Sequence, residues 1–245
     1  MQIANNTILI TGGATGIGLA LARALVERGN EAIICGRRRE RLEEAQREVP
    51  ALHIRQADVA SADDRAALVA WLAETHPRTN VLVNNAGVQH RVDLTDEENL
   101  RLAEEEIAVN LLAPIHLTAQ MLPLLRRNEP AAIINVSSGL AFAPLAHMPV
   151  YCATKAAVHS LTMSLRHQLR DTGVRVFEAI PPLVRSELGA WHRPAEMNRI
   201  AMSAEDAVNE LLQGLEQDEF EIAIGGAKQS REKREAMFDI LNARR

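Results

Sequence analysis

Short apolar runs and amphipathic stretches alternate along the whole chain. Residues 7–10 are almost uniformly apolar and are followed by glycines, which is typical of a strand buried on both faces. Residues 17–28 instead have helical spacing, with Arg23 and Glu27 directed outward, and Gly29 provides a natural helix end. The same alternation predicts strands at residues 7–10, 31–35, 52–58, 80–83, 131–136, 174–180 and 221–224 and helices at residues 17–28, 39–49, 62–74, 97–127, 150–172 and 204–215.

This alternation predicts an α/β fold with a mostly parallel sheet of about seven strands and helices on both faces. No repeat or linker divides the 245 residues, so we expect one doubly wound Rossmann domain spanning residues 1–245. The helix at residues 97–127 should bend near Asn110 and Pro114. Ligands of such folds bind beyond the carboxyl ends of the strands, so we expect the functional residues directly after each strand.

Composition narrows the function classes. A net charge of −5 and an aromatic content of 3% argue against nucleic-acid binding. Cys35 and Cys152 are too few for a disulfide scaffold or a cysteine-rich zinc site and fit a reducing cytoplasm.

The uncharged stretches 107–125 and 130–154 are interrupted by prolines and polar residues. The first 22 residues lack the basic region of a signal peptide. We therefore expect a cytoplasmic protein without membrane spans.

The turn after the first strand is rich in glycine. Residues 11–18 read T-G-G-A-T-G-I-G, and glycines let a backbone turn tightly and approach a pyrophosphate at a helix N-terminus. The spacing differs from the G-x-G-x-x-G fingerprint, and a purely structural turn is the alternative. The candidate nucleotide-binding residues here are Gly12, Thr15, Gly16, Ile17 and Gly18.

Polar residues follow three further strands. Asp58 and Val59 follow the third, N-N-A-G at residues 84–87 follows the fourth, and two serines end the fifth, ahead of Y-x-x-x-K at residues 151–155. With the glycine-rich turn, this order resembles the short-chain dehydrogenase/reductase family over nearly the whole chain, and within it the small bacterial DltE-like oxidoreductases. The resemblance implies hydride transfer between NADP(H) and a neutral carbonyl compound or secondary alcohol.

The same resemblance assigns four catalytic residues. Tyr151 and Lys155 are four positions apart and share a helix face, where an ammonium would favour the phenolate. By resemblance, Tyr151 is the general acid/base and Lys155 holds the cofactor ribose and tunes Tyr151. Ser138 would bind the substrate oxygen, with Ser137 as the competing candidate, and Asn110 would anchor a water in a proton relay. Taken singly, these residues are better explained by structural roles, as an exposed pair, a turn cap and a core amide; it is their occurrence together that favours catalysis.

Further cofactor contacts come from the other strand ends. The resemblance implies that Asp58 contacts the adenine amino group, with Val59 beside the ring. Asn84, Ala86 and Gly87 would border the adenosine ribose, although Asn84 could instead be structural. Tyr151 and Lys155 also count among the cofactor contacts.

Cofactor selectivity is usually set after the second strand. Gly36 stands where NAD-dependent relatives carry an aspartate, and Arg37, helped by Arg38, could bind a 2′-phosphate. We therefore predict NADP(H) over NAD(H), the alternative being a solvated charge run. Val184 and Ser186 are the alignment-based candidates for the nicotinamide amide, although proline replaces the usual glycine at position 182 and serine replaces threonine at position 186.

The substrate side should be mostly apolar, which favours a neutral substrate. Its expected wall comprises Gln89, His90, Leu140, Phe142, Leu145 and His147. Residues 188–202, with Trp191 and His192, form either a lid or surface decoration. The eight histidines show no compact ligand spacing, and we predict no catalytic metal.

The resemblance also bears on assembly and on the main alternative. Relatives associate through two long helices, so the apolar faces of residues 107–125 and 158–169 predict a homodimer or homotetramer, although burial in the core of the chain itself would also account for these faces. The alternative is a non-catalytic, NADP-sensing regulatory protein on the same fold. Such proteins usually lack part of the catalytic set, which is complete here.

Overall fold

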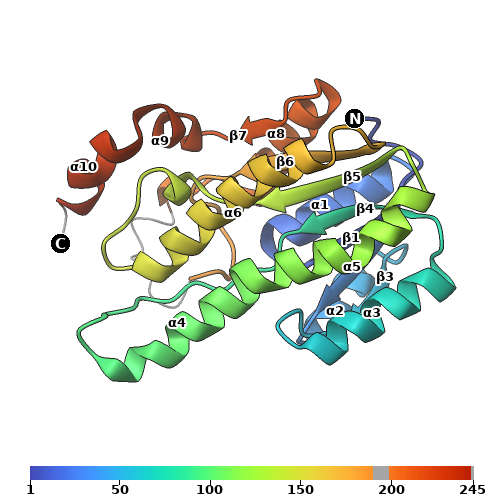
Figure 1. The fold of residues 1–245 in the computed structure, drawn as a ribbon, viewed down its shortest axis with the longest axis horizontal. Helices are drawn as coiled ribbons and strands as arrows, with labels where there is room; N and C mark the ends of the chain where they lie inside the picture. Colours follow the sequence, from blue (N-terminus) through green and yellow to red (C-terminus); the bar gives the residue numbers. More distant parts are fainter. Residues whose placement is uncertain (190–198, 244–245) are drawn as a thin grey trace.

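The computed structural model describes residues 1–189 and 199–243. Its centre is one seven-stranded sheet in the order β3-β2-β1-β4-β5-β6-β7, in which every pairing is parallel (Figure 1). The prediction of a doubly wound parallel sheet is confirmed. The strands are β1 (Thr7–Thr11), β2 (Glu31–Gly36), β3 (His53–Gln56), β4 (Thr79–Asn84), β5 (Ala131–Val136), β6 (Val174–Ile180) and β7 (Glu221–Ala223).

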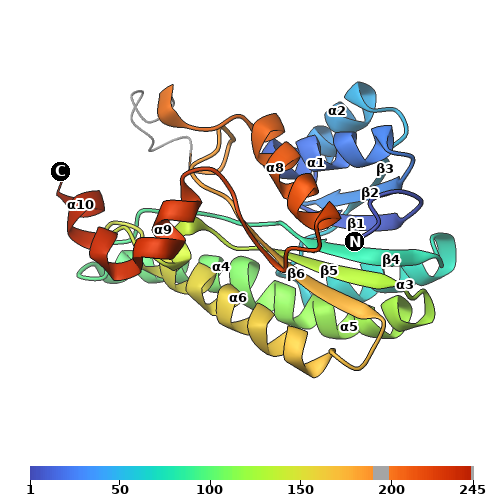
Figure 2. The ribbon, with the colours of Figure 1, turned by 90° about the horizontal axis from the view of Figure 1, so that it is seen from above.

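Helices cover both faces of the sheet (Figure 2). One face carries α1 (Gly16–Glu27), α2 (Arg39–Glu48) and α8 (Ala204–Glu216), and the other carries α3 (Ala62–Thr75), α5 (Ala113–Arg127) and α6 (Pro149–Gln168). Within β1, Ile8 and Ile10 belong to the first core cluster, whereas Leu9 belongs to the second. Because successive side chains of a strand point to opposite faces, an all-apolar strand supplies both layers.

The long helical stretch is interrupted where the sequence predicted a bend. After the short 3₁₀ turn η1 (Glu97–Asn99), α4 (Leu100–Ile107) leads into a π-helical turn, η2 (Ala108–Leu112), and then α5. Pro114 has no N–H to donate to the carbonyl of Asn110, so a regular helix cannot pass through this point unchanged. Such π turns are frequent at functional sites.

The stretch Glu97–Arg127 is also long and apolar enough, by length and composition alone, to cross a membrane. In this fold α5 packs against β4 and β5, and its inner face, including Leu117 and Met121, is fully buried. Core helices pass the same test of length and composition, and this stretch serves as one.

The C-terminal end extends beyond the predicted elements. After β7 come α9 (Ala227–Lys233), η5 (Arg234–Met237) and α10 (Phe238–Asn242), none of which the sequence pattern predicted. Helix α9 packs against the 3₁₀ turn η3 (Gly139–Ala141) that follows β5. Helix α6, in turn, ends at Gln168, four residues before the predicted end at residue 172, because the Thr172 N–H bonds back to the Leu169 carbonyl at 3.0 Å.

The strand order fixes where a ligand can bind. From β1 the chain winds outward through β2 and β3 and then returns to β4 on the other side of β1. The turns after β1 and β4 therefore diverge and leave a crevice at the carboxyl edge of the sheet, which is the usual ligand site of such folds.

Candidate active site

A groove of about 420 Å³ lies at this switch in strand order. It is formed by the turns after β1, β2, β3 and β4 together with residues 186–189. Twelve of the predicted cofactor-binding residues line it: Gly12, Thr15, Gly16, Ile17, Gly18, Arg37, Arg38, Asp58, Val59, Ala86, Gly87 and Ser186.

The turn after β1 needs its glycines. Gly16 has a φ of +55°, and a Cβ there would lie 2.9 Å from the Ser186 Cβ. A Cβ on Gly18 would lie 2.4 Å from the Gly12 carbonyl oxygen. Thr15, the N-cap residue of α1, makes no side-chain capping bond, and the first turn of α1 carries no acidic residue. The free N–H groups at this helix end are suited to an anion such as a pyrophosphate.

Two polar side chains brace this turn against the one after β4. The Thr11 hydroxyl oxygen accepts hydrogen bonds from the N–H groups of Asn85 and Ala86, both at 3.0 Å. The Asn85 side-chain amide donates to the carbonyls of Thr11 at 2.9 Å and Gly12 at 3.1 Å. Neither residue is among the predicted site residues, although Thr11 lies in the glycine-rich motif and Asn85 in the N-N-A-G motif.

The arginines after β2 form a basic edge of the groove. Arg37 pairs with Glu105 at 3.2 Å and Arg38 pairs with Glu187 at 2.7 Å. Arg41, which the sequence analysis did not assign, also lines the groove and pairs with Glu187 at 2.7 Å. These ion pairs are largely exposed, so a bound phosphate can replace the carboxylates at little cost.

Four of the sixteen predicted cofactor contacts do not line the groove: Tyr151 and Lys155, which lie on α6, and Asn84 and Val184. Asn84 is buried, and its amide donates to Asn135 Oδ1 at 2.8 Å and Thr118 Oγ1 at 3.2 Å, which matches its structural alternative. Val184 is buried in the core and forms a bridge with Met202. Most of the predicted lid, including Trp191 and His192, lies outside the described residues.

Tyr151 and Lys155 lie in the first turns of α6, and both are buried. The Lys155 Nζ donates to the Val136 carbonyl at 2.9 Å and lies 5.7 Å from the centroid of the Tyr151 ring. A Cβ built on Gly87 would lie 3.4 Å from Asn110 Oδ1 and 3.7 Å from Lys155 Nζ. The structure therefore brings Asn110, Lys155 and the turn after β4 together at one end of the groove.

Asn110 lies in the π-helical turn and holds the backbone after β4. Its Oδ1 accepts from the Val88 N–H and its Nδ2 donates to the Val88 carbonyl, both at 2.8 Å. Nδ2 also donates to Thr154 Oγ1 at 3.3 Å. The side chain thus links η2, the turn after β4 and the start of α6.

The two serines after β5 have different partners. The Ser137 hydroxyl donates to the buried carboxylate of Glu178 at 2.5 Å. Ser138 accepts from the Leu140 N–H at 3.1 Å, which makes it the cap of η3, and it lies close enough to Tyr151 to influence the pKa of that phenol. Of the two, Ser138 is the serine beside the tyrosine.

Burial controls the protonation of this pair. It raises the pKa of Tyr151 well above its usual value, although the neighbouring Ser138 opposes the shift, and it lowers the pKa of Lys155 to about 8. We expected the Lys155 ammonium to lower the pKa of Tyr151, but desolvation dominates for both groups. Tyr151 is therefore a neutral phenol here, the form that can donate a proton.

Glu106, a residue that the sequence analysis overlooked, is fully buried on α4. Its Oε1 accepts from the His90 N–H at 2.6 Å, while Oε2 has no partner within the described chain. Burial raises its pKa to about 7, and its charge raises the pKa of Tyr151. Glu106 could have been predicted from the sequence as a site residue, because it lies four residues before Asn110 and therefore on the same helix face.

The expected substrate wall is only partly assembled beside Tyr151. Leu140 and Leu145 pack around Tyr151, Cys152 and Met148, and Gln89 and His90 line the groove. The peptide N–H of Val92 donates to the His147 carbonyl at 3.3 Å. Phe142 instead packs with Ile180 and Ala227 in a separate cluster, because α9 covers it.

The C-terminal helix holds the substrate-side loop. Asn242 on α10 accepts from the Ala146 N–H at 2.7 Å and donates to the Pro144 carbonyl at 3.1 Å. These contacts span nearly a hundred residues of sequence, and no local pattern indicated them.

Comparison with known proteins identifies the family. A family model described as short chain dehydrogenase matches residues 6–196. The "Uncharacterized oxidoreductase DltE" of Bacillus subtilis (strain 168) is 46% identical over 243 residues, covering 98% of this chain and 96% of that protein.

Two solved structures share the architecture. A short chain dehydrogenase from Burkholderia cenocepacia J2315 in complex with NADP has 26% identity and a TM-score of 0.83, covering 95% of this chain and 94% of that one. A short chain dehydrogenase/reductase from Burkholderia phymatum in complex with NAD has a TM-score of 0.84 at 22% identity, covering 94% of this chain and 93% of that one, and shows the fold alone. The chain belongs to the short-chain dehydrogenase family and is an NAD(P)-linked oxidoreductase acting on CH–OH or C=O groups.

Proposed function

We propose that this protein transfers a hydride between NADP(H) and a neutral carbonyl compound or the corresponding secondary alcohol, with Tyr151 as general acid/base. The observation that carries the proposal is the buried phenol of Tyr151 with the Lys155 Nζ 5.7 Å from its ring and Ser138 beside it. This arrangement lies beside a groove whose helix end and arginines suit a dinucleotide phosphate.

Different residues of the groove would hold different parts of the cofactor. The glycine-rich turn and the N-terminus of α1 would hold the pyrophosphate, and Arg37 and Arg38 would hold a 2′-phosphate. Asp58 and Val59 would border the adenine. When bound, the reduced nicotinamide supplies the hydride that the carbonyl carbon receives.

The chain's own groups handle the proton. Ser138 would hydrogen-bond to the substrate oxygen and position it against the Tyr151 hydroxyl, which donates its proton as charge develops on that oxygen. The Lys155 ammonium beside the ring would stabilise the resulting phenolate. Asn110 fixes the backbone after β4, next to Lys155, where a water could return the proton.

Catalysis by Tyr151 can be tested with Tyr151→Phe. We expect kcat/KM for NADPH oxidation, on the best substrate from a panel of ketones, aldehydes and keto esters, to fall by about 10²- to 10⁴-fold. NADPH affinity should remain within a few-fold of the parent value. Equal turnover by the variant would refute the assignment, as would NADPH binding without turnover of any compound in the panel.

Cofactor choice can be tested with Arg37→Ala. Removing one charge-assisted contact should weaken NADPH binding by about 10- to 100-fold and leave NADH binding unchanged. Arg39→Ala is the matched control, because Arg39 pairs with Glu43 on the exposed side of α2. A preference for NADH that Arg37→Ala does not alter would contradict the proposal.

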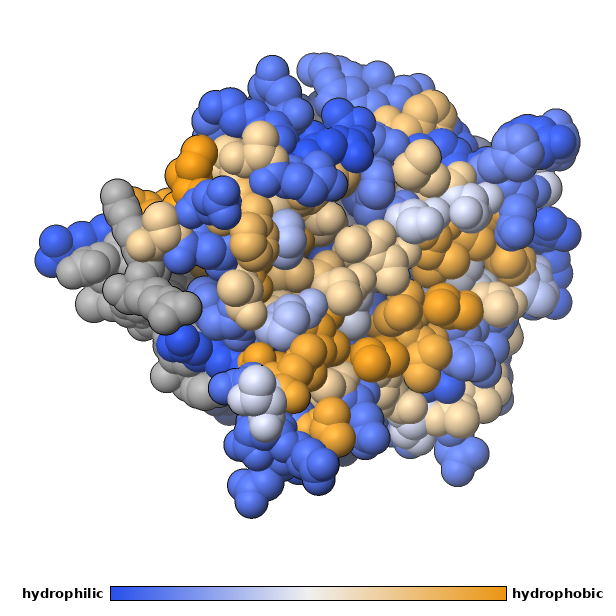
Figure 3. All heavy atoms as spheres, turned by 60° about the vertical axis from the view of Figure 1, so that its left-hand side comes forward, coloured by the Kyte–Doolittle hydropathy of each residue, from blue (hydrophilic) through white to orange (hydrophobic). Residues whose placement is uncertain are grey.

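An apolar face supports self-association. Figure 3 shows apolar side chains gathered on one face of the molecule. Large exposed apolar residues lie along the neighbouring elements α4, η2, α5 and α6: Leu100, Ile107, Leu112, Ile115 and Met163. We therefore propose a homodimer or homotetramer formed through these helices in the cytoplasm. A light-scattering mass equal to one chain would refute it.

A further inference from the structure

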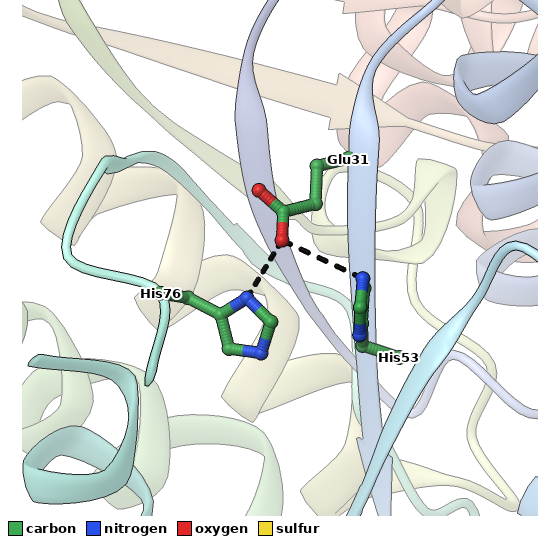
Figure 4. Close-up of side chains that lie close together, drawn as sticks. All are labelled: Glu31, His53 and His76. Carbon is green, nitrogen blue, oxygen red and sulfur yellow. Dashed lines mark hydrogen bonds and ion pairs between the residues drawn. The ribbon is translucent and has the colours of Figure 1, made fainter. Parts of the chain in front are cut away.

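Three side chains of metal-ligand type meet at the edge of the sheet opposite the groove (Figure 4). Glu31 Oε1 lies 2.7 Å from His76 Nδ1 and 3.5 Å from His53 Nε2. One ligand atom from each residue lies within 4.8 Å of the other two. Both histidine rings face the same Glu31 oxygen (Figure 4).

The fold creates this cluster from distant parts of the sequence. Glu31 is the first residue of β2, His53 is the first residue of β3, and His76 caps the C-terminus of α3. Parallel strands begin at one edge of a sheet and end at the other, so the cluster lies across the sheet from the groove. It therefore belongs to neither the cofactor site nor the substrate site.

The surroundings hold two of the three groups in place. The Thr7 hydroxyl donates to Glu31 Oε2 at 2.9 Å, which orients the carboxylate and leaves Oε1 toward the histidines. The His76 ring lies against Trp71, with 4.9 Å between centroids, and only 8% of its side chain is exposed. The His53 side chain is 49% exposed and can move. Fixed outer-shell partners of this kind are a regular feature of metal sites.

We propose that Glu31, His53 and His76 form a binding site for a divalent zinc-type ion. Two imidazoles and one carboxylate are a donor set that Zn²⁺ accepts, with a further position left for water. A tetrahedral zinc with bonds of about 2.1 Å separates its ligand atoms by about 3.4 Å. The distance from Glu31 Oε1 to His53 Nε2 already matches this value.

Binding would need only a small rearrangement. The hydrogen shared between His76 and Glu31 must leave, since a metal takes the neutral imidazole lone pair, and their 2.7 Å separation must widen by about 0.7 Å. Rotation of the exposed His53 ring would complete the set. Arg55 is the nearby opposing charge, but its guanidinium is stacked on Trp71, 5.3 Å from the ring centroid.

A bound ion would connect β2, β3 and the end of α3. An ion that binds the folded chain but not the unfolded chain stabilises the folded state by mass action. The melting temperature should therefore rise with metal concentration. The hydride-transfer site lies at the other edge of the sheet, and its chemistry does not depend on this ion. The inference therefore stands or falls separately from the proposed function.

The test is a titration of the metal-stripped, untagged protein with ZnCl₂ at neutral pH by calorimetry. We expect one Zn²⁺ per chain and a melting temperature that rises with added zinc. Co²⁺ used as a probe should give the intense visible absorption of a tetrahedral site. His53→Gln should weaken zinc binding at least about tenfold, since even changes in the outer shell of metal sites have effects of that size.

Two further variants make the result decisive. His167→Gln removes an exposed histidine elsewhere and should bind zinc like the parent protein. Glu31→Gln should weaken binding as His53→Gln does, while NADPH oxidation by the His53→Gln protein stays at the parent rate. Either an absence of saturable zinc binding over the micromolar range, or binding unaffected by both His53→Gln and Glu31→Gln, would overturn the proposal.

Discussion

Replacing Glu106 with glutamine should change how stability depends on pH. The Glu106 side chain is fully buried, with one oxygen bonded to the His90 N–H and the other unpartnered within the described chain. Burial raises its pKa from 4.5 to about 7. Glutamine has nearly the same shape and keeps an acceptor for the His90 N–H, but it does not ionise.

The sign and size follow from proton linkage. Below a pH of about 4.5 the carboxyl group is protonated in both states and has no effect. Between that pH and about 7 the unfolded chain is ionised while the folded chain keeps its proton, so the free energy of unfolding falls by about 1.4 kcal/mol per pH unit. Above this range the free energy of unfolding stays about 3 kcal/mol below the value that it would have without this pKa shift. Glu106→Gln should therefore become progressively more stable than the parent across this interval.

The assay is urea denaturation of both proteins at a series of pH values. The quantity of interest is the difference in the free energy of unfolding between the two proteins, because titrating groups that do not interact with Glu106 contribute equally to both. Glu98→Gln, at an exposed position, controls for the loss of one carboxyl group. A difference between Glu106→Gln and parent that stays constant from pH 4.5 to pH 8 would show that this buried carboxyl group does not hold its proton.

Two further predictions address the groove and the substrate loop. Gly18→Ala should abolish NADPH binding measured by fluorescence titration, because the added Cβ would lie 2.4 Å from the Gly12 carbonyl oxygen; binding at parent affinity would contradict the turn geometry. Asn242→Ala should raise KM for the carbonyl substrate several-fold at constant NADPH affinity, because it frees the Ala146 N–H and the Pro144 carbonyl. Unchanged steady-state kinetics would show that α10 does not position this loop.

The sheet was predictable because the apolar composition of each strand indicates whether helices cover both of its faces. β1, β4 and β5 are short apolar runs, and only a strand covered by helices on both faces needs such composition. Glycines and polar residues directly after these runs marked the carboxyl edge, and the fold brings most of them into one groove. The α9–α10 segment was missed because, apart from Ala227 and Met237, it buries little apolar surface and therefore has no strong periodic pattern.

Charged groups show where local patterns cease to be informative. Residues 104–106 are three consecutive glutamates, and such a run taken alone suggests an exposed helix face. Because a helix turns by 100° per residue, Glu106 instead lies on the buried side, in line with Ala103 and Asn110. No sequence pattern predicts the cluster of Glu31, His53 and His76, for a different reason. Its members are far apart in the sequence, and only the pairing of β2 with β3 and the end of α3 bring them together. In both cases, the environment that sets the chemistry comes from the packing of several elements. Motif order can locate a catalytic edge, but the protonation of a buried carboxyl group and a ligand set built across strands must be derived from the folded chain.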